Sequence, residues 1–125
     1  KSVVFNGQTI QPFFVLGPSR SGRKIVISGD TRPTSKIKRF IDNADLAVLE
    51  STYFDDHKDN AKENLHMTAR EAAEMASEAG VKQVVLTHFS SRYKDIESFL
   101  PEIFGIHPNL LAAYDFLVLD ISNPN

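Results

Sequence analysis

The chain has 125 residues, a formal net charge of −2, no cysteine and 42% hydrophobic residues. This composition fits one globular domain or part of a larger one, and it excludes a wholly disordered chain. The longest apolar run, 110–114, is far shorter than the roughly 20 residues that cross a bilayer, so no membrane segment is expected. Without cysteine, a bound metal needs histidine and carboxylate ligands, and a reducing cytoplasmic location is expected.

The first stretch predicts a hairpin. Residues 3–5 form a strand-like run that ends at Asn6-Gly7, the strongest short turn signal. A return strand is expected over 9–16, with Pro12 placing it at an edge or a bulge. The chain begins with Lys1 and opens directly into this strand, so we expect it to be cut from a longer protein.

Strands and helices then alternate, which is typical of an α/β layered architecture. Buried strands are expected over 24–28 and 46–49, separated by a helix that starts near Thr34. The buried face of this helix should hold the residues at helical spacing, Ile37, Phe40, Ile41 and Ala44. Residues 53–65 are charged and show no periodicity, so they are expected to form a loop.

The second half continues the alternation. Thr68 and Glu71 have the spacing of a capping box, so a helix should begin there and end at Gly80. A third buried strand is expected over 83–86. The remaining expected elements are a helix over 93–104 that breaks or kinks at Pro101, and closing strands over 110–113 and 116–121.

Charge is unevenly distributed along this frame. The stretch 20–39 carries seven basic residues and one acid, Asp30, whereas 40–78 carries ten acids and three bases. A basic block is typical of a surface that meets phosphate or nucleic acid. An ordinary solvated face fits the same counts, because charge counts contain no geometry.

Polar residues stand where the buried strands end. Asp30, Glu50 and His88 each follow or close such a strand, and the carboxyl ends of neighbouring strands are where α/β folds place their sites. His66 lies two residues before the capping Thr68, near a helix N-terminus that favours an anion. Purely structural roles remain open: Asp30 could cap a helix, Glu50 could pair with the basic block, and His88 could be structural.

Four strings in order give these positions a context: 28–33 (SGDTRP), 44–53 (ADLAVLESTY), 66–73 (HMTAREAA) and 86–93 (LTHFSSRY). Together they closely resemble the carboxyl-terminal half of ribonuclease Z, the tRNA 3′-end endonuclease family of the metallo-β-lactamase superfamily. The resemblance implies an α/β fold that is half of an αββα sandwich, with the whole chain belonging to that half.

The resemblance also implies roles. Asp30 matches a carboxylate that bridges two zinc ions, His88 a terminal zinc ligand, and His66 a non-ligand histidine beside the scissile phosphate. Glu50 matches the acid of the family's His-Glu-Ala-Thr string, although Leu49 and Ser51 replace its His and Ala. We expect Glu50 to orient His66. The implied cofactor is a pair of zinc ions, with manganese as the alternative.

Substrate contacts are expected from Arg92, Arg32 and Ser90. The Gly17-Pro18 loop matches the flank of the family's tRNA-gripping arm. The implied partner is precursor tRNA, whose 3′ trailer would be removed by metal-activated water to leave a 3′-hydroxyl, and the implied assembly is a cytoplasmic homodimer.

The family's His-x-His-x-Asp-His motif is absent from the sequence. Asp30 and His88 would supply two of about seven ligand positions, so we expect this segment alone to be inactive. Alternatives are a superfamily hydrolase of a small ester or phosphodiester, and an inactive fragment or accessory module. His57 and His107 are expected outside the site, as a solvated residue of the acidic loop and a turn residue.

Overall fold

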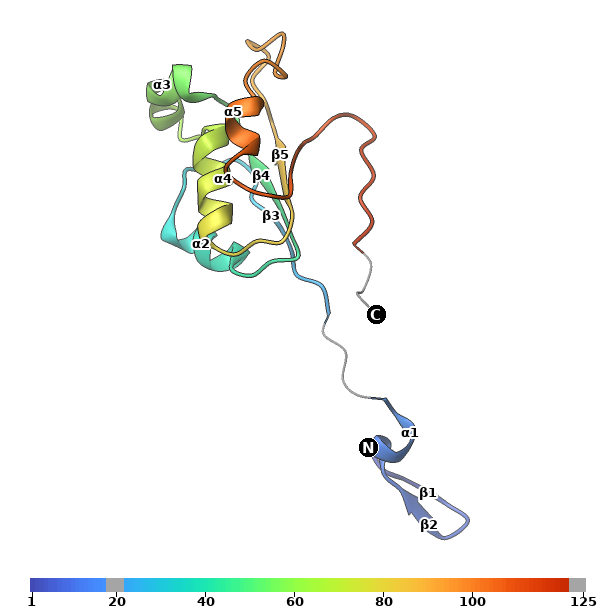
Figure 1. Ribbon diagram of the computed structural model, residues 1–125. Coiled ribbons are helices and arrows are strands. Elements are labelled where there is room, and N and C mark those ends of the chain that lie inside the picture. The colour runs from blue at the N-terminus through green and yellow to red at the C-terminus, as the bar shows by residue number, and fades with distance from the viewer. Residues whose placement is uncertain (18–21, 122–125) are drawn as a thin grey trace.

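The computed structural model describes residues 1–17 and 22–121. The first two strands, β1 (Val3–Phe5) and β2 (Gln8–Ile10), form the predicted antiparallel hairpin. Its turn residues have φ angles of 49° at Asn6 and 76° at Gly7, the left-handed conformation that a tight hairpin turn needs. The hairpin carries exposed apolar side chains and is drawn in blue in Figure 1.

The main body is a parallel sheet in the order β3-β4-β5-β6. Its strands, as predicted in place and order, are β3 (Ile25–Ile27), β4 (Leu46–Glu50), β5 (Val84–Thr87) and β6 (Leu110–Ala112). Because all four strands run the same way, their carboxyl ends meet along one edge of the sheet and their amino ends along the other.

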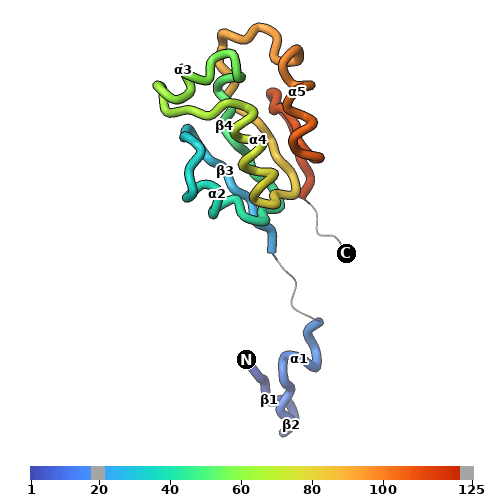
Figure 2. The backbone as a smooth tube through the Cα atoms, turned by 60° about the vertical axis from the view of Figure 1, so that its left-hand side comes forward, coloured from blue at the N-terminus to red at the C-terminus, as the bar shows by residue number. Residues whose placement is uncertain are grey.

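Helices cover one face of this sheet, as Figures 1 and 2 show. The central helix α4 (Ala69–Glu78) packs on β4 and β5, flanked by α2 (Ser35–Ile41) and α5 (Pro101–Phe104). The capping box is confirmed: the Thr68 hydroxyl accepts from Glu71 N–H, and the Glu71 carboxylate accepts from Thr68 N–H. The core between helices and sheet consists mainly of aliphatic and alanine side chains, including Leu49, Val84 and Leu86, together with Phe54 and two methionines.

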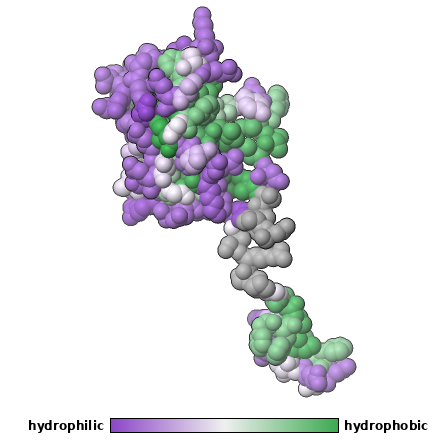
Figure 3. Space-filling view, in the orientation of Figure 1, coloured by the Kyte–Doolittle hydropathy of each residue, from purple (hydrophilic) through white to green (hydrophobic). Residues whose placement is uncertain are grey.

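The opposite face of the sheet is exposed at its two outer strands, whereas Leu46 and Val85 in its middle are buried. Val26 packs against the core, but its neighbours Ile25 and Ile27 are 52% and 72% exposed. Leu111, on β6, is 38% exposed. The expectation of a buried strand at 24–28 is therefore wrong, because β3 is an outer strand whose Val26 is only partly buried and whose other residues are exposed. Figure 3 shows apolar side chains gathered on the side away from the helices.

Three expectations about local structure are wrong. The return strand ends at Ile10, because Pro12 starts a short helix, α1 (Pro12–Val15), where a missing N–H is harmless. The expected loop 53–65 contains a 3₁₀ turn, η1 (Asp55–His57), and α3 (Lys58–Glu63), anchored by the fully buried Ala61.

The third wrong expectation is the long helix over 93–104, of which only α5 is helical. Residues before it are held by aromatic packing instead: the rings of Tyr93 and Phe99 lie 5.0 and 4.7 Å from the ring of Phe54.

Two smaller differences from the sequence expectations concern the buried face of α2 and the expected strand over 116–121. Phe40 is 64% exposed, so the buried face of α2 is narrower than its spacing predicts, although Ile41 is fully buried. Within the described part of 116–121 no strand forms, and Leu117 N–H instead donates to the Tyr114 carbonyl in a turn. No described helix is long and apolar enough to cross a membrane.

Candidate functional site

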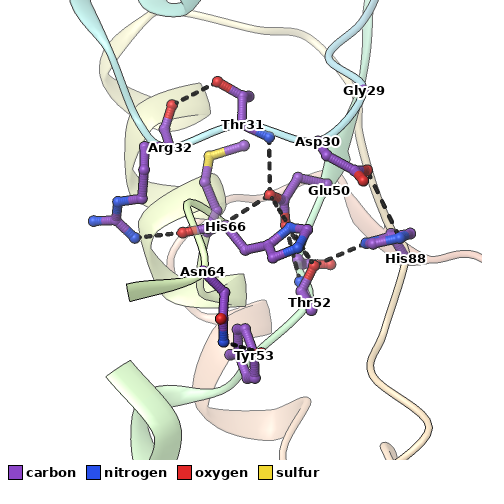
Figure 4. A network of polar contacts seen from close by, with 12 residues as sticks. Gly29, Asp30, Thr31, Arg32, Glu50, Thr52, Tyr53, Asn64, His66 and His88 are labelled. Atoms are coloured by element: carbon purple, nitrogen blue, oxygen red, sulfur yellow. Dashed lines mark hydrogen bonds and ion pairs between the residues drawn. The ribbon is translucent and has the colours of Figure 1, made fainter. Parts of the chain in front are cut away.

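The predicted site residues come together at the carboxyl edge of the sheet (Figure 4). Asp30 follows β3, Glu50 ends β4, His88 follows β5 directly, and His66 lies between α3 and α4. One ligand atom from each of Asp30, His66 and His88 lies within 4.8 Å of the others. Residues up to 58 positions apart in the chain thus converge, as their strand-end positions predict.

Left-handed backbone accompanies each of the three converging side chains. Gly29, before Asp30, has φ 60°, and Leu65, before His66, has φ 61°. His88 itself has φ 62°, a conformation that costs a non-glycine residue energy and that clusters at functional sites. The chain therefore turns sharply at each position, and Figure 4 shows the side chains of all three directed to the same place.

Glu50 is the buried centre of the site, with 2% of its surface exposed. Its Oε1 accepts hydrogen bonds from the backbone N–H groups of Thr31 and Met67, both at 3.0 Å, and lies 3.0 Å from His66 Nδ1. Its Oε2 accepts from the N–H and the hydroxyl of Thr52, at 3.1 and 2.8 Å. Among the described residues, these contacts satisfy the carboxylate without a lysine or arginine partner, and they place Glu50 directly beside the His66 ring.

The two site histidines differ in their surroundings. The His66 side chain is 20% exposed, and its ring meets the Tyr53 ring edge-on at 6.1 Å. The His88 side chain is 48% exposed, and its Nε2 lies 3.7 Å from Asp30 Oδ1. The Asp30 side chain is 61% exposed, so Asp30 and His88 face outward, whereas Glu50 is buried.

The donor set at the open side suits a divalent metal. A tetrahedral zinc with ligand bonds of about 2.0–2.2 Å holds neighbouring donor atoms about 3.3–3.6 Å apart. The separation of Asp30 Oδ1 and His88 Nε2, 3.7 Å, is close to that range. Asp30 and His88 therefore fit as ligands of one ion by both chemistry and spacing.

Arg32 takes a place that its sequence position did not predict. Its Nη1 and Nη2 bind the two carboxylate oxygens of Glu71 at 2.8 and 2.6 Å, and Nη1 also donates to the His66 carbonyl at 2.5 Å. The guanidinium expected to contact phosphate is thus engaged with the protein. Since Glu71 also closes the capping box of α4, Arg32 ties the Asp30 loop to the start of that helix.

Ser90 and Arg92 lie on the loop after His88. The Ser90 hydroxyl accepts from the backbone N–H and the Nε of Arg92, at 3.4 and 3.3 Å. The Arg92 guanidinium lies 5.0 Å from the centre of the Tyr53 ring, in a cation–π arrangement. Because Tyr53 contacts His66, Arg92 is held beside the site with an exposed charge.

Some of the other basic residues are engaged within the fold. Lys38 pairs with Glu78 at 2.6 Å, and Lys24 Nζ donates to the Asp42 carbonyl at 2.6 Å. The basic block thus meets acids of the following stretch rather than standing wholly apart. Arg20 and most of the Gly17-Pro18 loop lie outside the described residues.

His57 and His107 stand apart from the converging cluster. His57 is not simply solvated as expected: it lies 2.9 Å from Asp56 and stacks 6.4 Å from the Tyr53 ring. His107 is buried, and its Nε2 lies 2.8 Å from the Val81 carbonyl. It lies between two turns rather than in one, and it makes a tertiary contact that sequence spacing could not reveal.

Two residues near the site were not anticipated. Thr52 contacts Glu50 and both site histidines, and its position two residues after Glu50 was the available signal. Tyr93 accepts from Phe54 N–H and donates to Asp56. Burial is the main cause that raises the pKa of Tyr93, with the Asp56 carboxylate adding to it.

Comparison with known proteins gives consistent results. The family described as "Beta-lactamase superfamily domain" matches residues 7–89. Ribonuclease Z of Archaeoglobus fulgidus is 43% identical over 123 residues, covering 98% of this chain and 40% of that protein. Ribonuclease Z of Nitrosopumilus maritimus is 42% identical over 119 residues, covering 95% and 40%.

Among solved structures, the short form of human tRNase Z superposes with a TM-score of 0.65 at 35% identity, covering 82% of this chain and 35% of that chain. A long-form ribonuclease Z from yeast gives 0.62 at 30% identity, covering 72% and 12%. The chain spans about 40% of the length of the curated relatives named above. These similarities confirm the resemblance read from the four strings and the metallo-β-lactamase fold.

Proposed function

Because this chain belongs to the β-lactamase superfamily, we propose that it is part of a ribonuclease Z-like endoribonuclease that removes the 3′ trailer from precursor tRNA. The observation that carries the proposal is the convergence of Asp30, His66 and His88 within 4.8 Å at one sheet edge. All three were assigned from the family motif, and they meet although 36 and 22 residues separate them in sequence.

The chain would form the carboxyl-terminal half of the catalytic domain. Ile25, Ile27 and Leu111 leave exposed apolar side chains on the outer strands of the face away from the helices, and exposed apolar surface of this kind marks a place where another element packs. A second sheet on this face would complete an αββα sandwich. The matched relatives are long enough to supply one, since they extend well beyond this segment.

Asp30 and His88 would hold metal, with Asp30 shared between two zinc ions or, alternatively, manganese. The metal supplies a water of lowered pKa as the attacking group. Remaining ligands would come from the other half of the domain, because two side chains are fewer than the four that zinc takes. The 125-residue segment by itself should therefore show no tight zinc site in a calorimetric titration.

His66 would act on the leaving group. Its Nδ1 faces the buried Glu50 carboxylate, so its Nε2 is the atom available to substrate. A proton delivered from Nε2 would neutralise the ribose 3′-oxygen as the phosphodiester breaks. Acid catalysis of this kind is worth about 100- to 10,000-fold.

Arg92 would hold a substrate phosphate, with Ser90 fixing its backbone and Nε. Its exposed guanidinium beside Tyr53 supports this role. A homodimeric, cytoplasmic enzyme remains the expected setting, consistent with a cysteine-free chain and a tRNA substrate.

Metal analysis of variants of the complete protein tests these roles. Asp30→Ala and His88→Ala should lose zinc, because each removes a ligand, whereas His66→Ala should retain it. Zinc-free His66→Ala beside zinc-replete His88→Ala would reverse the assignment of the two histidines.

Cleavage assays test the reaction itself. His66→Ala should slow precursor tRNA cleavage by about 100-fold or more, yet slow hydrolysis of an aryl phosphodiester far less, since nitrophenolate leaves without a proton. Equal losses on both substrates would replace the acid role by electrostatic stabilisation of the phosphate. Turnover of the small diester with none of precursor tRNA would favour a small-substrate hydrolase instead.

A further inference from the structure

Thr52 stands at the threonine position of the family's His-Glu-Ala-Thr string, and its side chain occupies a central position in the site. It is 7% exposed and lies two residues beyond Glu50, where β4 has ended. Its hydroxyl oxygen lies 2.8 Å from Glu50 Oε2, 2.8 Å from His88 Nδ1 and 3.1 Å from His66 Nδ1. Figure 4 shows this one oxygen between the carboxylate and both imidazoles.

The hydrogen positions follow from counting donors and acceptors. A threonine hydroxyl has one hydrogen to donate and two lone pairs to accept with. Its hydrogen goes to Glu50 Oε2, because an ionised carboxylate can only accept. The oxygen then has nothing left to donate, so both histidines must bring their own hydrogen to it.

His88 therefore carries its proton on Nδ1 and donates it to Thr52. His66 also carries a proton on Nδ1, shared between Thr52 Oγ1 at 3.1 Å and Glu50 Oε1 at 3.0 Å. With Nδ1 protonated, the neutral His88 ring has a bare lone pair on Nε2, the atom 3.7 Å from Asp30 Oδ1. Two acceptors facing each other across that distance leave a place for a cation between them.

We propose that Thr52 is a positioning residue that fixes the Nδ1–H tautomer of His88 and links this ring to the Glu50–His66 pair. A free histidine favours the other tautomer, with the proton on Nε2, which would turn an N–H toward the metal position. The hydroxyl reverses that preference. Through one oxygen, the buried Glu50 charge thus supports the metal side and the phosphate side of the site together.

The two histidines should respond differently to loss of the hydroxyl. His66 retains Glu50 Oε1 as an acceptor for Nδ1–H, whereas Thr52 is the partner that the structure gives to His88 Nδ1. Thr52→Val, which keeps the shape of the side chain, should therefore release the tautomer of His88 and leave that of His66. Thr52→Ser, which keeps the hydroxyl, should retain both.

Long-range ¹H–¹⁵N NMR of the metal-free complete protein, at alkaline pH where the imidazoles are neutral, reads these tautomers directly. We expect Nδ1–H at both rings in the wild type and in Thr52→Ser, and Nε2–H at His88 in Thr52→Val. Thr52→Ala serves as a second hydroxyl-free variant if the valine does not fold. Persistence of Nδ1–H at His88 in a folded hydroxyl-free variant would overturn the proposal.

A zinc competition titration measures the consequence, and only this second measurement rests on the proposed metal function. Loss of an outer-shell partner typically weakens metal binding by about 10- to 100-fold, so Thr52→Val should show that loss and Thr52→Ser should restore affinity. Unchanged zinc affinity in a Thr52→Val protein would contradict the positioning role. A wild type that binds no zinc but shows the expected tautomers would refute the metal function and leave the tautomer assignment standing.

Ser51→Ala is the matched control. Ser51 is fully buried and its hydroxyl donates to the Thr87 carbonyl at 2.8 Å, so its removal also deletes one buried hydrogen bond beside the site. It should leave both tautomers and zinc affinity unchanged. An equal effect of Ser51→Ala would assign the Thr52 result to general loosening of this edge and overturn the proposal.

Discussion

The two edges of the sheet each hold an acid, and the surroundings of the two acids differ. At the carboxyl edge, Glu50 is buried and accepts from neutral groups of Thr31, Met67 and Thr52 and from His66. At the amino edge, Asp45 pairs with two cations, Lys82 at 2.8 Å and Arg23 at 3.8 Å. The cations cancel the charge of Asp45, whereas the charge of Glu50 is left to act on the histidines.

This comparison separates a structural acid from a functional one. Asp45 also accepts from Lys24 N–H at 2.8 Å and joins the starts of β3, β4 and β5. Glu50 ends β4, accepts from Thr31 N–H after β3, and reaches His88 after β5 through the Thr52 hydroxyl. The backbone and hydroxyl groups that donate to Glu50 carry no full charge. The charge of Glu50 is therefore directed at the His66 imidazole, whose Nδ1 lies 3.0 Å from Oε1. The carboxyl edge is therefore suited to catalysis, whereas the amino edge holds the strands of the sheet together.

The largest expected effect comes from removing each acid in turn. Glu50→Ala leaves buried N–H and O–H donors without a partner, so the metal-free complete protein should lose about 3–5 kcal/mol of unfolding free energy. Asp45→Ala should cost less, since its partners remain free to meet water. Urea denaturation of both variants checks the order, and a larger loss from Asp45→Ala would invert the comparison.

A second test concerns the ion pair between Arg32 and Glu71, which lies at the carboxyl edge of the sheet. Arg32→Lys keeps a positive charge but cannot form the two-pronged contact with Glu71 or also hold the His66 carbonyl. A shifted His66 should lower kcat on precursor tRNA by about 10- to 100-fold, with zinc content and KM little changed. Steady-state kinetics on both substrates measure this.

The same kinetics distinguish positioning from the phosphate contact that the sequence predicted for Arg32. Loss of a phosphate contact raises KM and lowers the salt dependence of binding, with kcat preserved. Lys38→Met is the matched control, because it removes an exposed ion pair on the neighbouring helix α2. A raised KM in Arg32→Lys with normal kcat would return Arg32 to the substrate surface.

Sequence reasoning reached the features whose signals are local. Strands β3, β4 and β5, the capping box at Thr68 and the hairpin turn at Gly7 each depend on neighbouring residues, and each was placed correctly. The convergence of Asp30, Glu50 and His88 followed from parallel strands ending at one edge.

Features that depend on tertiary partners could not be predicted from the sequence. The long helix expected over 93–104 failed because Tyr93 and Phe99 pack on Phe54, far away in sequence. Arg32 was assigned to phosphate because its partner Glu71, 39 residues away, gives no signal in a charge count. Thr52 was missed since its role depends on three side chains meeting at one oxygen.

The pH dependence of stability tests the amino edge. The hydrogen bond from Lys82 is the largest cause that lowers the pKa of Asp45 in the folded state below its ordinary value of 3.8, with Lys24 N–H next. A lowered folded pKa gives stability that is present above the unfolded pKa and is lost as pH falls through the folded one. Asp45→Asn should therefore be less stable than wild type at neutral pH, and the difference should vanish in strong acid.

Denaturant unfolding across that pH range measures the difference. Lys82→Met should show the same pH trend, and the double variant should lose little more than either single variant if the pair acts as a unit. A stability difference that stays constant into strong acid would show that Asp45 acts through its shape rather than its charge.

The smallest expected effect tests where backbone strain lies. The amino edge uses Asn43 and Gly80 at positive φ, residues that adopt this conformation readily, whereas the carboxyl edge uses Leu65 at φ 61° directly before His66. Leu65 is 68% exposed, so its side chain gains little from packing to offset the strain. Leu65→Asn should stabilise the protein by about 0.5–1 kcal/mol, which corresponds to part of the energetic penalty that a non-glycine residue carries in the left-handed conformation.

Leu65→Ala is the control, because it removes the apolar side chain and keeps the β-carbon that causes the strain. If alanine stabilises as much as asparagine, the gain comes from removing an exposed apolar group; if asparagine alone stabilises, the turn that presents His66 is held against its own conformational preference.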